Sequence, residues 1–342
     1  MDIFKISYVT TLPKVGNSPR VTISGDENKT YLVKFYEYGK ELVSSGYCSS
    51  NNTIEANARQ WYTEWHITIQ DEGNNIVHQA FFNLRGETVF IKIDAHALGD
   101  NIAWIPYVER FREKHNCNVI CSTFYNDLFK ESYPNILFVT PNTVVENVYT
   151  QYYVGASTNE SIYCPINVNE VPLQMVAAAI LGLDVEELRP DLSGSYNRVK
   201  VPKKYVTLSE FGSIHSKEWK TKNGWQNVVD FLVDNGYDVV VISKEKTSLN
   251  NVIDYSGNIS LKCRVFDILN AEFHLGVSSG LSWLAWALGK HVVMISDVTP
   301  IWHEFQSDIT RLYANELNYV NYSADGQTKT HEVIEKLREM IV

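Results

Sequence analysis

The sequence predicts an α/β protein with an antiparallel β module at its N-terminus and two Rossmann-like halves after it. Residues 1–86 are rich in β-branched and aromatic runs separated by Gly/Asn turns, which indicates the antiparallel module. From residue 87 onward, short apolar strands alternate with helical stretches, as in a doubly wound parallel sheet. The alternation stops in a polar stretch at 191–204 and then starts again, so we expect domains at 87–200 and 201–325 and a C-terminal helix at 326–342.

The clearest element of the β module is a hairpin. Two extended runs, 65–70 and 76–82, flank the turn sequence DEGNN and predict two antiparallel strands. A further strand is expected at 30–38. We expect the module to serve assembly or substrate docking rather than catalysis.

The first parallel half begins with a strand at 89–93 and a helix at 101–115. Trp104, Val108 and Phe111 lie on one face of that helix, and Pro106 should kink its start. The alternation continues with strands at 118–121, 136–139, 205–209, 238–243, 273–277 and 291–296, and helices at 173–181, 225–235, 264–270, 281–288 and 331–341.

Composition argues against two classes of partner. The 342 residues include 30 Lys and Arg and 40 Asp and Glu, a formal net charge of −10. A chain this acidic suits neither a nucleic-acid backbone nor an anionic membrane surface, although one cationic site would still hold a phosphorylated small molecule. No apolar run approaches the roughly 20 residues of a spanning helix, and residues 1–16 lack the pattern of a signal peptide. We therefore expect a cytoplasmic protein.

The cysteines predict buried free thiols rather than a metal site. Their number is odd and none forms a C-x-x-C pair, which fits a reducing compartment. They are Cys48, Cys117, Cys121, Cys164 and Cys263.

The loop after the strand 89–93 holds the first candidate for chemistry. Asp100 stands at the start of the following helix, where it could cap the helix or take a proton from an attacking hydroxyl. Asp94, in the same loop, is the rival for the role of base. Further candidates for substrate contact are His96, Gly99 and Asn101, although His96 could equally be an ordinary loop residue.

Two strand ends of the second half carry residues that suit a phosphorylated ligand. Lys217 follows the strand 205–209, and since the sequence has no D-x-D pair at a strand end, a protein cation would have to balance the charge of a diphosphate. Lys220 and Lys222 are alternatives, and lysines in loops are often simply solvated. Ser243 and Lys244 end another strand, where a ribose or a base could bind.

The segment GVSSGLSW runs from a strand directly into an apolar helix. Free backbone N–H groups at such a helix start, with a glycine that permits close approach, form an anion site. We therefore expect Ser278, Ser279, Gly280 and Leu281 to hold phosphate, although an ordinary strand–turn–helix has the same pattern. Trp283 could form a wall of this site.

Together these segments resemble the inverting, two-domain heptosyltransferases. The helix start LGDNIAWIPYVERFREKH is similar to that family's first-strand loop, and SIHSKEW and SSGLSWLAWALG are similar to its donor-domain signatures. Closer still is the subgroup that adds heptose to serine residues of autotransporter adhesins, on the stretches FFNLRGETVFIKIDAHALGDNIAWIPYVE, CNVICSTFYNDLF, TVVENVY and GWQNVVDFL. The resemblance covers most of the chain, from about Arg20 to about Phe305.

The resemblance implies a GT-B type fold and roles for individual residues. Asp100 matches the family's catalytic base, Lys217 its donor-phosphate lysine, and 278–281 the turn that binds the diphosphate and sugar. It implies ADP-heptose as donor, a Ser/Thr hydroxyl of a protein as acceptor, a transfer that needs no metal or other cofactor, and a homo-oligomer. The alternatives are another nucleoside-diphosphate sugar, a saccharide acceptor, or a non-catalytic sugar-nucleotide-binding protein on the same scaffold.

The chain departs from the family pattern in two places. The autotransporter subgroup carries a cysteine-rich, metal-binding insert after the last strand of its second half. Here the segment 297–306 (DVTPIWHEFQ) contains no cysteine, which predicts a chain without that metal centre. Ser278 stands where the wider family has an acidic residue before Thr-Gly-Leu.

Overall fold

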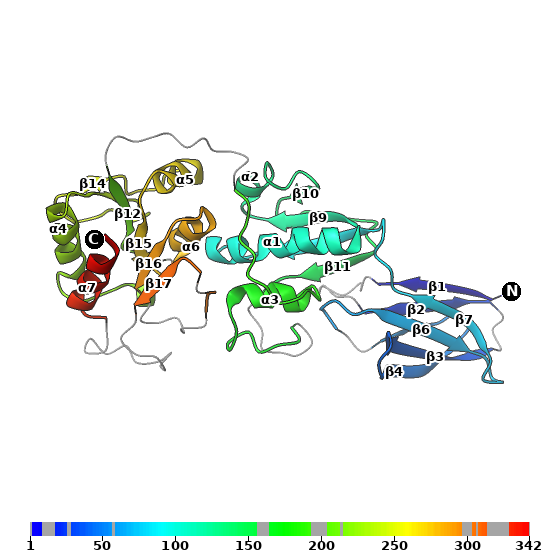
Figure 1. Ribbon diagram of the computed structural model, residues 1–342. Coiled ribbons are helices and arrows are strands. Elements are labelled where there is room, and N and C mark those ends of the chain that lie inside the picture. The colour runs from blue at the N-terminus through cyan, green and yellow to red at the C-terminus, as the bar shows by residue number, and fades with distance from the viewer. Residues whose placement is uncertain are drawn as a thin grey trace. The chain divides into compact units, whose positions relative to one another are not determined.

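The computed structural model describes residues 2–8, 18–25, 29–56, 59–155, 164–192, 204–212, 215–295, 303–305, 307–312 and 328–341 (Figure 1). The chain forms two compact units. The first unit contains Met1–Asp94, Tyr107–Asn126 and Tyr133–Glu186, and the second contains Ala95–Pro106, Asp127–Ser132 and Glu187–Val342. Most of the expected boundary region 191–204 and most of the segment 297–306 lie outside the described residues.

The N-terminal part of the first unit consists of two antiparallel sheets. One has the strand order β1-β2-β5, with β1 (Ile3–Ser7), β2 (Arg20–Ser24) and β5 (Thr53–Glu55). The other has the order β4-β3-β6-β7, with β3 (Thr30–Glu37), β4 (Leu42–Ser49), β6 (Trp65–Gln70) and β7 (Ile76–Phe81). A shared apolar core includes Val21, Phe35 and Trp65. The predicted hairpin is confirmed, because β6 pairs antiparallel with β7.

A parallel sheet follows in the first unit, in the strand order β10-β9-β8-β11. Its strands are β8 (Thr88–Ile93), β9 (Asn118–Thr123), β10 (Ile136–Val139) and β11 (Thr150–Tyr153), and the short helices nearby in sequence are α2 (Asn126–Phe129) and α3 (Leu173–Ile180). Strand β11 was not predicted, because TQYY is too short and too polar to signal a strand by itself. Its pairing with β8 supplies what the local sequence lacks.

Helix α1 (Leu98–His115) leads from β8 to β9 and is longer than expected. The helix continues through Pro106. By their contacts, its residues up to Pro106 belong to the second unit, and its residues from Tyr107 onward belong to the first unit. Trp104, Val108 and Phe111 are all buried, as the apolar spacing predicts.

The second unit is built on a sheet whose six strands in the described residues are all parallel. The order is β14-β13-β12-β15-β16-β17, with β12 (Tyr205–Ser209), β13 (Asp238–Val241), β14 (Ile253–Asp254), β15 (His274–Val277), β16 (Val292–Ile295) and β17 (Ile309–Leu312). This is the Rossmann strand order 3-2-1-4-5-6, so the topological switch point lies between β12 and β15. The predicted α/β class with parallel sheets is confirmed.

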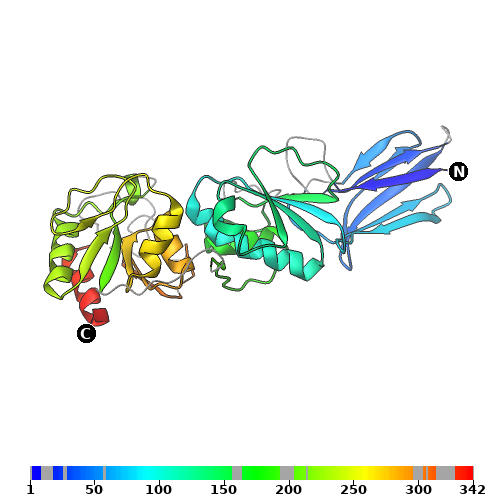
Figure 2. The same ribbon diagram turned by 90° about the horizontal axis from the view of Figure 1, so that it is seen from above.

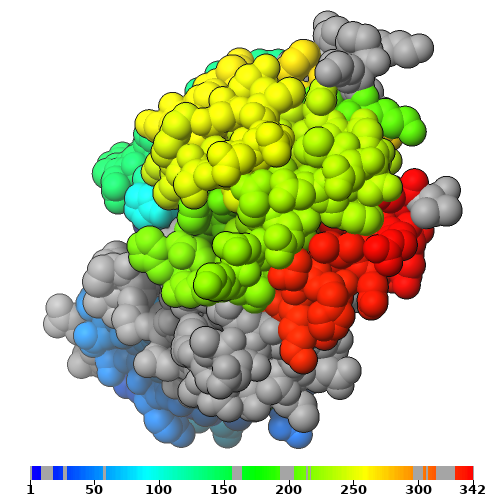
Figure 3. Space-filling model, turned by 90° about the vertical axis from the view of Figure 1, so that its left-hand side faces the viewer, coloured from blue at the N-terminus to red at the C-terminus, as the bar shows by residue number. Residues whose placement is uncertain are grey.

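Helices cover both faces of this second sheet. Helices α4 (Gly224–Asp234) and α7 (Thr330–Ile341) pack on one face, where Val228, Leu232, Val333 and Leu337 join a core with the strands (Figures 1 and 2). Figure 3 views this side of the unit, with the red surface of α7 beside the yellow-green surface that includes α4. Helices α5 (Leu261–Leu269) and α6 (Gly280–Ala287) lie on the opposite face (Figure 1).

The cysteines follow the prediction with one exception. Four are buried free thiols, whereas Cys263 is exposed. It lies on the face of α5 that also carries the exposed Lys262 and Phe266, so the amphipathic helix turns it toward solvent. Among the described residues, no helix combines the length and the apolar character needed to cross a membrane.

Candidate active site

Two helix N-termini meet within the second unit. By its contacts, the start of α1 belongs to this unit, as does the start of α6. A Cβ atom on Gly99 would lie 2.7 Å from Cδ1 of Trp283, and one on Gly280 would lie 2.8 Å from Cβ of Leu98. Real Cβ atoms almost never come this close, so the two glycines allow the helix starts to touch. The loop after β8 and the turn after β15 therefore come together at one place.

Asp100 lies half-buried in the first turn of α1, at this meeting point. Burial raises the pKa of its carboxyl group to about 6, and the nearby positive charge of Lys217 limits the rise. Such a group is still largely ionised at neutral pH but binds a proton more tightly than an exposed aspartate. These are the properties of a general base.

The other predicted residues around Asp100 have different surroundings. Asp94, the rival base, lies in the first unit, and its Oδ1 accepts a hydrogen bond of 2.7 Å from Ser122 Oγ on β9. Asn101 is fully buried, and its amide donates to the carbonyl oxygens of residues 95 and 97, each at 2.8 Å. Asn101 therefore holds the loop that precedes Asp100, while His96 is exposed.

Lys217 ends a short 3₁₀ helix, His215–Lys217, in the loop after β12. It is half-buried, whereas Lys220 and Lys222 are exposed. Burial lowers the pKa of the Lys217 ammonium group, the carboxylate of Asp100 opposes this shift, and the positive charge of Arg311 adds to it. Lys217 and Asp100 are thus electrostatically coupled, although they are far apart in the sequence.

The turn after β15 contains two serines with different roles. Ser278 is buried, and its Oγ donates a 3.2 Å hydrogen bond to Glu304 Oε1. Ser279 is the N-cap residue of α6, and its buried Oγ has no hydrogen-bond partner among the described residues. Gly280 and Leu281 begin the helix, so their backbone N–H groups belong to the unsatisfied first turn. This helix start is suited to an anion.

A buried ion pair beside Ser278 was not predicted from the sequence. Arg311 on β17 pairs with Glu304, and the two side chains are only 2% and 1% exposed. No hydrophobic period or motif links the two residues, so only the tertiary structure reveals the pair. A third residue of this region, His303, was also missed; its ring lies edge-on to Trp283, with centroids 6.5 Å apart.

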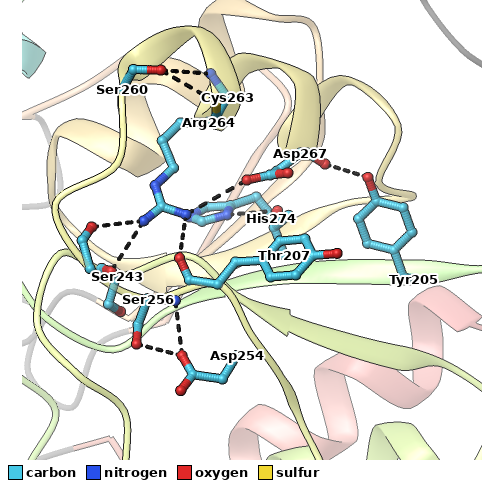
Figure 4. A network of polar contacts seen from close by, with 12 residues as sticks. Tyr205, Thr207, Ser243, Asp254, Ser256, Ser260, Cys263, Arg264, Asp267 and His274 are labelled. Atoms are coloured by element: carbon cyan, nitrogen blue, oxygen red, sulfur yellow. Dashed lines mark hydrogen bonds and ion pairs between the residues drawn. The ribbon is translucent and has the colours of Figure 1, made fainter.

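The strand end after β13 is organised differently. Ser243 is fully buried, and its Oγ accepts a 2.9 Å hydrogen bond from the backbone N–H of Glu210. Arg264 of α5 donates to the carbonyl oxygens of Ser243, Tyr255 and Gly257, at 3.5, 2.7 and 2.9 Å (Figure 4). Its guanidinium group also lies 3.6 Å from the carboxylate of Asp267. Lys244, next to Ser243, is exposed.

Comparison with known proteins identifies the family. No family model matches the sequence. The chain is 31% identical to the autotransporter heptosyltransferase Aah of Escherichia coli over 274 residues, which cover 76% of this chain and 69% of Aah. The chain belongs to the autotransporter heptosyltransferases. This confirms the resemblance seen in the sequence and places the chain among the glycosyltransferases.

Further members of the family show how much of its relatives' length this chain spans. It is 31% identical over 269 residues to BAHTCr of Citrobacter rodentium, covering 73% of this chain and 64% of that protein. It therefore spans about two thirds of the length of these curated relatives. A member from Burkholderia thailandensis, BimC, is 27% identical over 267 residues, covering 74% of this chain and 63% of BimC, and is named an inactive autotransporter heptosyltransferase. Membership alone therefore does not establish activity.

A solved structure confirms the fold. The crystal structure of TibC, described as a dodecameric iron-containing heptosyltransferase in complex with ADP-D-beta-D-heptose, superposes with a TM-score of 0.82. The match covers 100% of this chain and 96% of TibC at 22% identity. At this identity the likeness shows the mixed α/β fold with parallel sheets.

The iron described for TibC has no counterpart in the described part of this chain. Among those residues, no three His, Cys, Asp or Glu side chains come together as metal ligands. Of the segment 297–306, where the sequence lacks the family's cysteine-rich insert, only residues 303–305 are described.

Proposed function

We propose that this chain is an active, cytoplasmic heptosyltransferase of the GT-B type. It transfers heptose from ADP-heptose to a serine or threonine hydroxyl of a protein acceptor. The observation that carries the proposal is the coupled pair of Asp100 and Lys217 beside the start of α6. Aah and BAHTCr are named autotransporter heptosyltransferases, which supports heptose as the sugar and a protein as the acceptor. The ADP-heptose bound to TibC supports the donor.

The donor diphosphate would bind at the first turn of α6. Backbone N–H groups there, the unpartnered Oγ of Ser279 and the ammonium group of Lys217 all suit phosphate oxygens. The turn follows β15 and Lys217 follows β12, so both lie at the topological switch point of the sheet, where ligands of this fold bind.

The transfer would then proceed by a single displacement. Asp100 takes the proton of the acceptor hydroxyl as its oxygen attacks the anomeric carbon from the face opposite the diphosphate. The new carbon–oxygen bond forms while the bond from the anomeric carbon to the phosphate oxygen breaks, and its electron pair leaves with ADP. The anomeric configuration inverts. Lys217 and the helix start stabilise the departing charge, the role that a divalent metal has in other transferases.

The assembly is part of the same proposal. We expect the chain to form a homo-oligomer, because TibC is described as dodecameric. Light scattering after size-exclusion chromatography measures the mass directly, and a monomer at micromolar concentration would contradict the expectation.

Two measurements on the unmodified protein test the function. Thermal unfolding over a panel of nucleoside-diphosphate sugars should show the largest rise with ADP-heptose, because a ligand that binds the folded state stabilises it. Mass spectrometry of a co-expressed adhesin should show added heptose residues. A hexose-sized addition would indicate another donor, binding without transfer would indicate an inactive binding protein, and no binding of any nucleotide sugar would contradict the proposal.

A further inference from the structure

His303 is a polar group near the proposed base that the mechanism above does not use. Its ring lies edge-on to the indole of Trp283, at an interplanar angle of 81°. The same indole packs against Gly99, the residue before Asp100. The imidazole therefore belongs to the cluster formed by the starts of α1 and α6, all within the second unit.

Burial and nearby positive charges keep the ring of His303 neutral. Burial lowers the pKa of the imidazole, and the charges of Lys217 and Arg311 lower it further, to about 3. The side chain is nevertheless only half-buried, so a ligand can reach it. Among the described residues, its ring nitrogens make no hydrogen bond.

A neutral imidazole has one N–H donor and one acceptor nitrogen. A hydroxyl group also donates and accepts, so it matches this ring at either nitrogen. A phosphate oxygen can only accept and matches the N–H alone, and a cationic ligand would be repelled by Lys217 and Arg311. The ring chemistry therefore favours a hydroxyl group, which can bind at either nitrogen, over a phosphate oxygen, which can bind at only one.

We propose that His303 binds a hydroxyl group of the sugar carried by the donor and helps to determine which sugar is transferred. The inference rests on the proposed function, which places the diphosphate between Lys217 and the start of α6. The sugar is attached to that diphosphate, and its anomeric carbon must lie within reach of the hydroxyl that Asp100 deprotonates. A side chain beside both Lys217 and the Trp283–Gly99 contact is therefore next to the sugar.

The test compares the affinity for ADP with the affinity for ADP-heptose, both measured by titration calorimetry. His303→Ala should weaken ADP-heptose binding roughly 3- to 10-fold, the effect of one hydrogen bond, and leave ADP binding unchanged. His303→Gln keeps a donor and an acceptor and should recover part of the loss. His331→Gln is the matched control, because His331 is exposed on α7 and should change neither affinity.

Two other patterns of affinity would contradict the inference. Equal losses for ADP and ADP-heptose would place His303 on the phosphates and overturn the inference, as would unchanged affinity for both ligands in His303→Ala and His303→Gln. Thermal unfolding of each variant without ligand confirms that the fold is retained, and the glutamine variant serves if the alanine variant unfolds. If the unmodified protein does not bind ADP-heptose, the proposed function fails and the inference fails with it; if it binds ADP-heptose and the His303 variants bind it equally well, the inference alone fails.

Discussion

The strand ends after β13 and β15 both carry serine, yet the structure uses them in opposite ways. Ser243, after β13, is fully buried and holds the backbone of Glu210, while its carbonyl group accepts from Arg264. Ser279, after β15, starts α6 with an Oγ that has no partner in the described part of the chain. A polar residue at the carboxyl end of a strand is therefore a good ligand candidate only when its hydrogen-bonding groups are not already used by the protein.

The same contrast extends to the neighbours of the two serines. We call Ser243, Arg264 and Asp267 the committed network, because protein groups satisfy their polar atoms. We call Asp100, Lys217 and Ser279 the open cluster, because they gather at the helix starts with capacity for a ligand. Substitutions in the committed network should lower stability, and those in the open cluster should lower activity while the fold is retained.

The largest effect is expected for Asp100→Asn. Loss of the base should reduce turnover about 10²–10⁴-fold and leave the affinity for ADP-heptose nearly unchanged. The folded-state pKa of about 6 exceeds the ordinary value of 3.8, so the ionised carboxylate destabilises the folded state at pH 7.5. The neutral asparagine should therefore raise the free energy of unfolding by about 1–3 kcal/mol, measured with urea. Full activity in this variant would make another group, such as Asp94, the base.

Arg264→Met tests the committed network. The substitution removes the Arg264 donor from the carbonyl oxygen of Tyr255 and leaves the carboxylate of Asp267 unpaired, whereas the carbonyl oxygen of Gly257 still accepts from the backbone N–H of Ile259. Breaking such a buried pair should lower the free energy of unfolding by about 3–5 kcal/mol. The control is Arg338→Met, because Arg338 is exposed on α7 and its loss should cost only about 0.5 kcal/mol. Equal costs for the two variants would mean that the network does not stabilise the unit.

Lys217→Met tests whether the ammonium group of Lys217 binds the diphosphate of the donor. Removal of a charged partner of the diphosphate should weaken the binding of ADP and of ADP-heptose about 10- to 100-fold. Stability should not fall, because burial already disfavours the ammonium group. Lys220→Met is the matched control, since Lys220 is exposed. If both variants bind ADP like the unmodified protein, Lys217 does not hold the diphosphate.

The smallest effects are expected for the two serines, where one substitution should change donor affinity and the other should change stability. Ser279→Ala should weaken donor binding roughly 3- to 10-fold and change stability little. Ser243→Ala should leave donor binding unchanged but cost about 1–3 kcal/mol of stability, because the buried N–H of Glu210 loses its acceptor. Calorimetry and urea unfolding of both variants measure the two quantities. The reverse pattern would overturn the distinction between committed and open groups.

Much of the fold could be predicted from the sequence, because long strands and amphipathic helices carry their own signals. The spacing of Trp104, Val108 and Phe111 identified a buried helix face correctly. In the β module, β1, β2, β4 and β5 were missed, and in the parallel sheets β11, β14 and β17 were missed. Each of the last three has four residues or fewer, and each is defined by its pairing with a neighbour rather than by its own composition.

The position of the candidate site could also be predicted in part. Asp100, Lys217 and Ser279 each follow a strand of a parallel sheet, and carboxyl ends of such strands gather ligands. Ser243 met the same criterion, but only the structure shows that its oxygen is engaged. His303, Glu304 and Arg311 carry no signal at all, because neither their spacing nor their neighbours distinguish them from ordinary core and loop residues.

The pH dependence of kcat/KM for heptose transfer tests the central claim that Asp100 is a base under the influence of Lys217. Between about pH 5 and 8, kcat/KM should rise to a plateau with a midpoint near pH 6, because only the ionised carboxylate accepts the proton. The midpoint should move to higher pH in Lys217→Met, which removes the charge that lowers the pKa of Asp100. A profile without this midpoint, or the same midpoint in Asp100→Asn, would contradict the account.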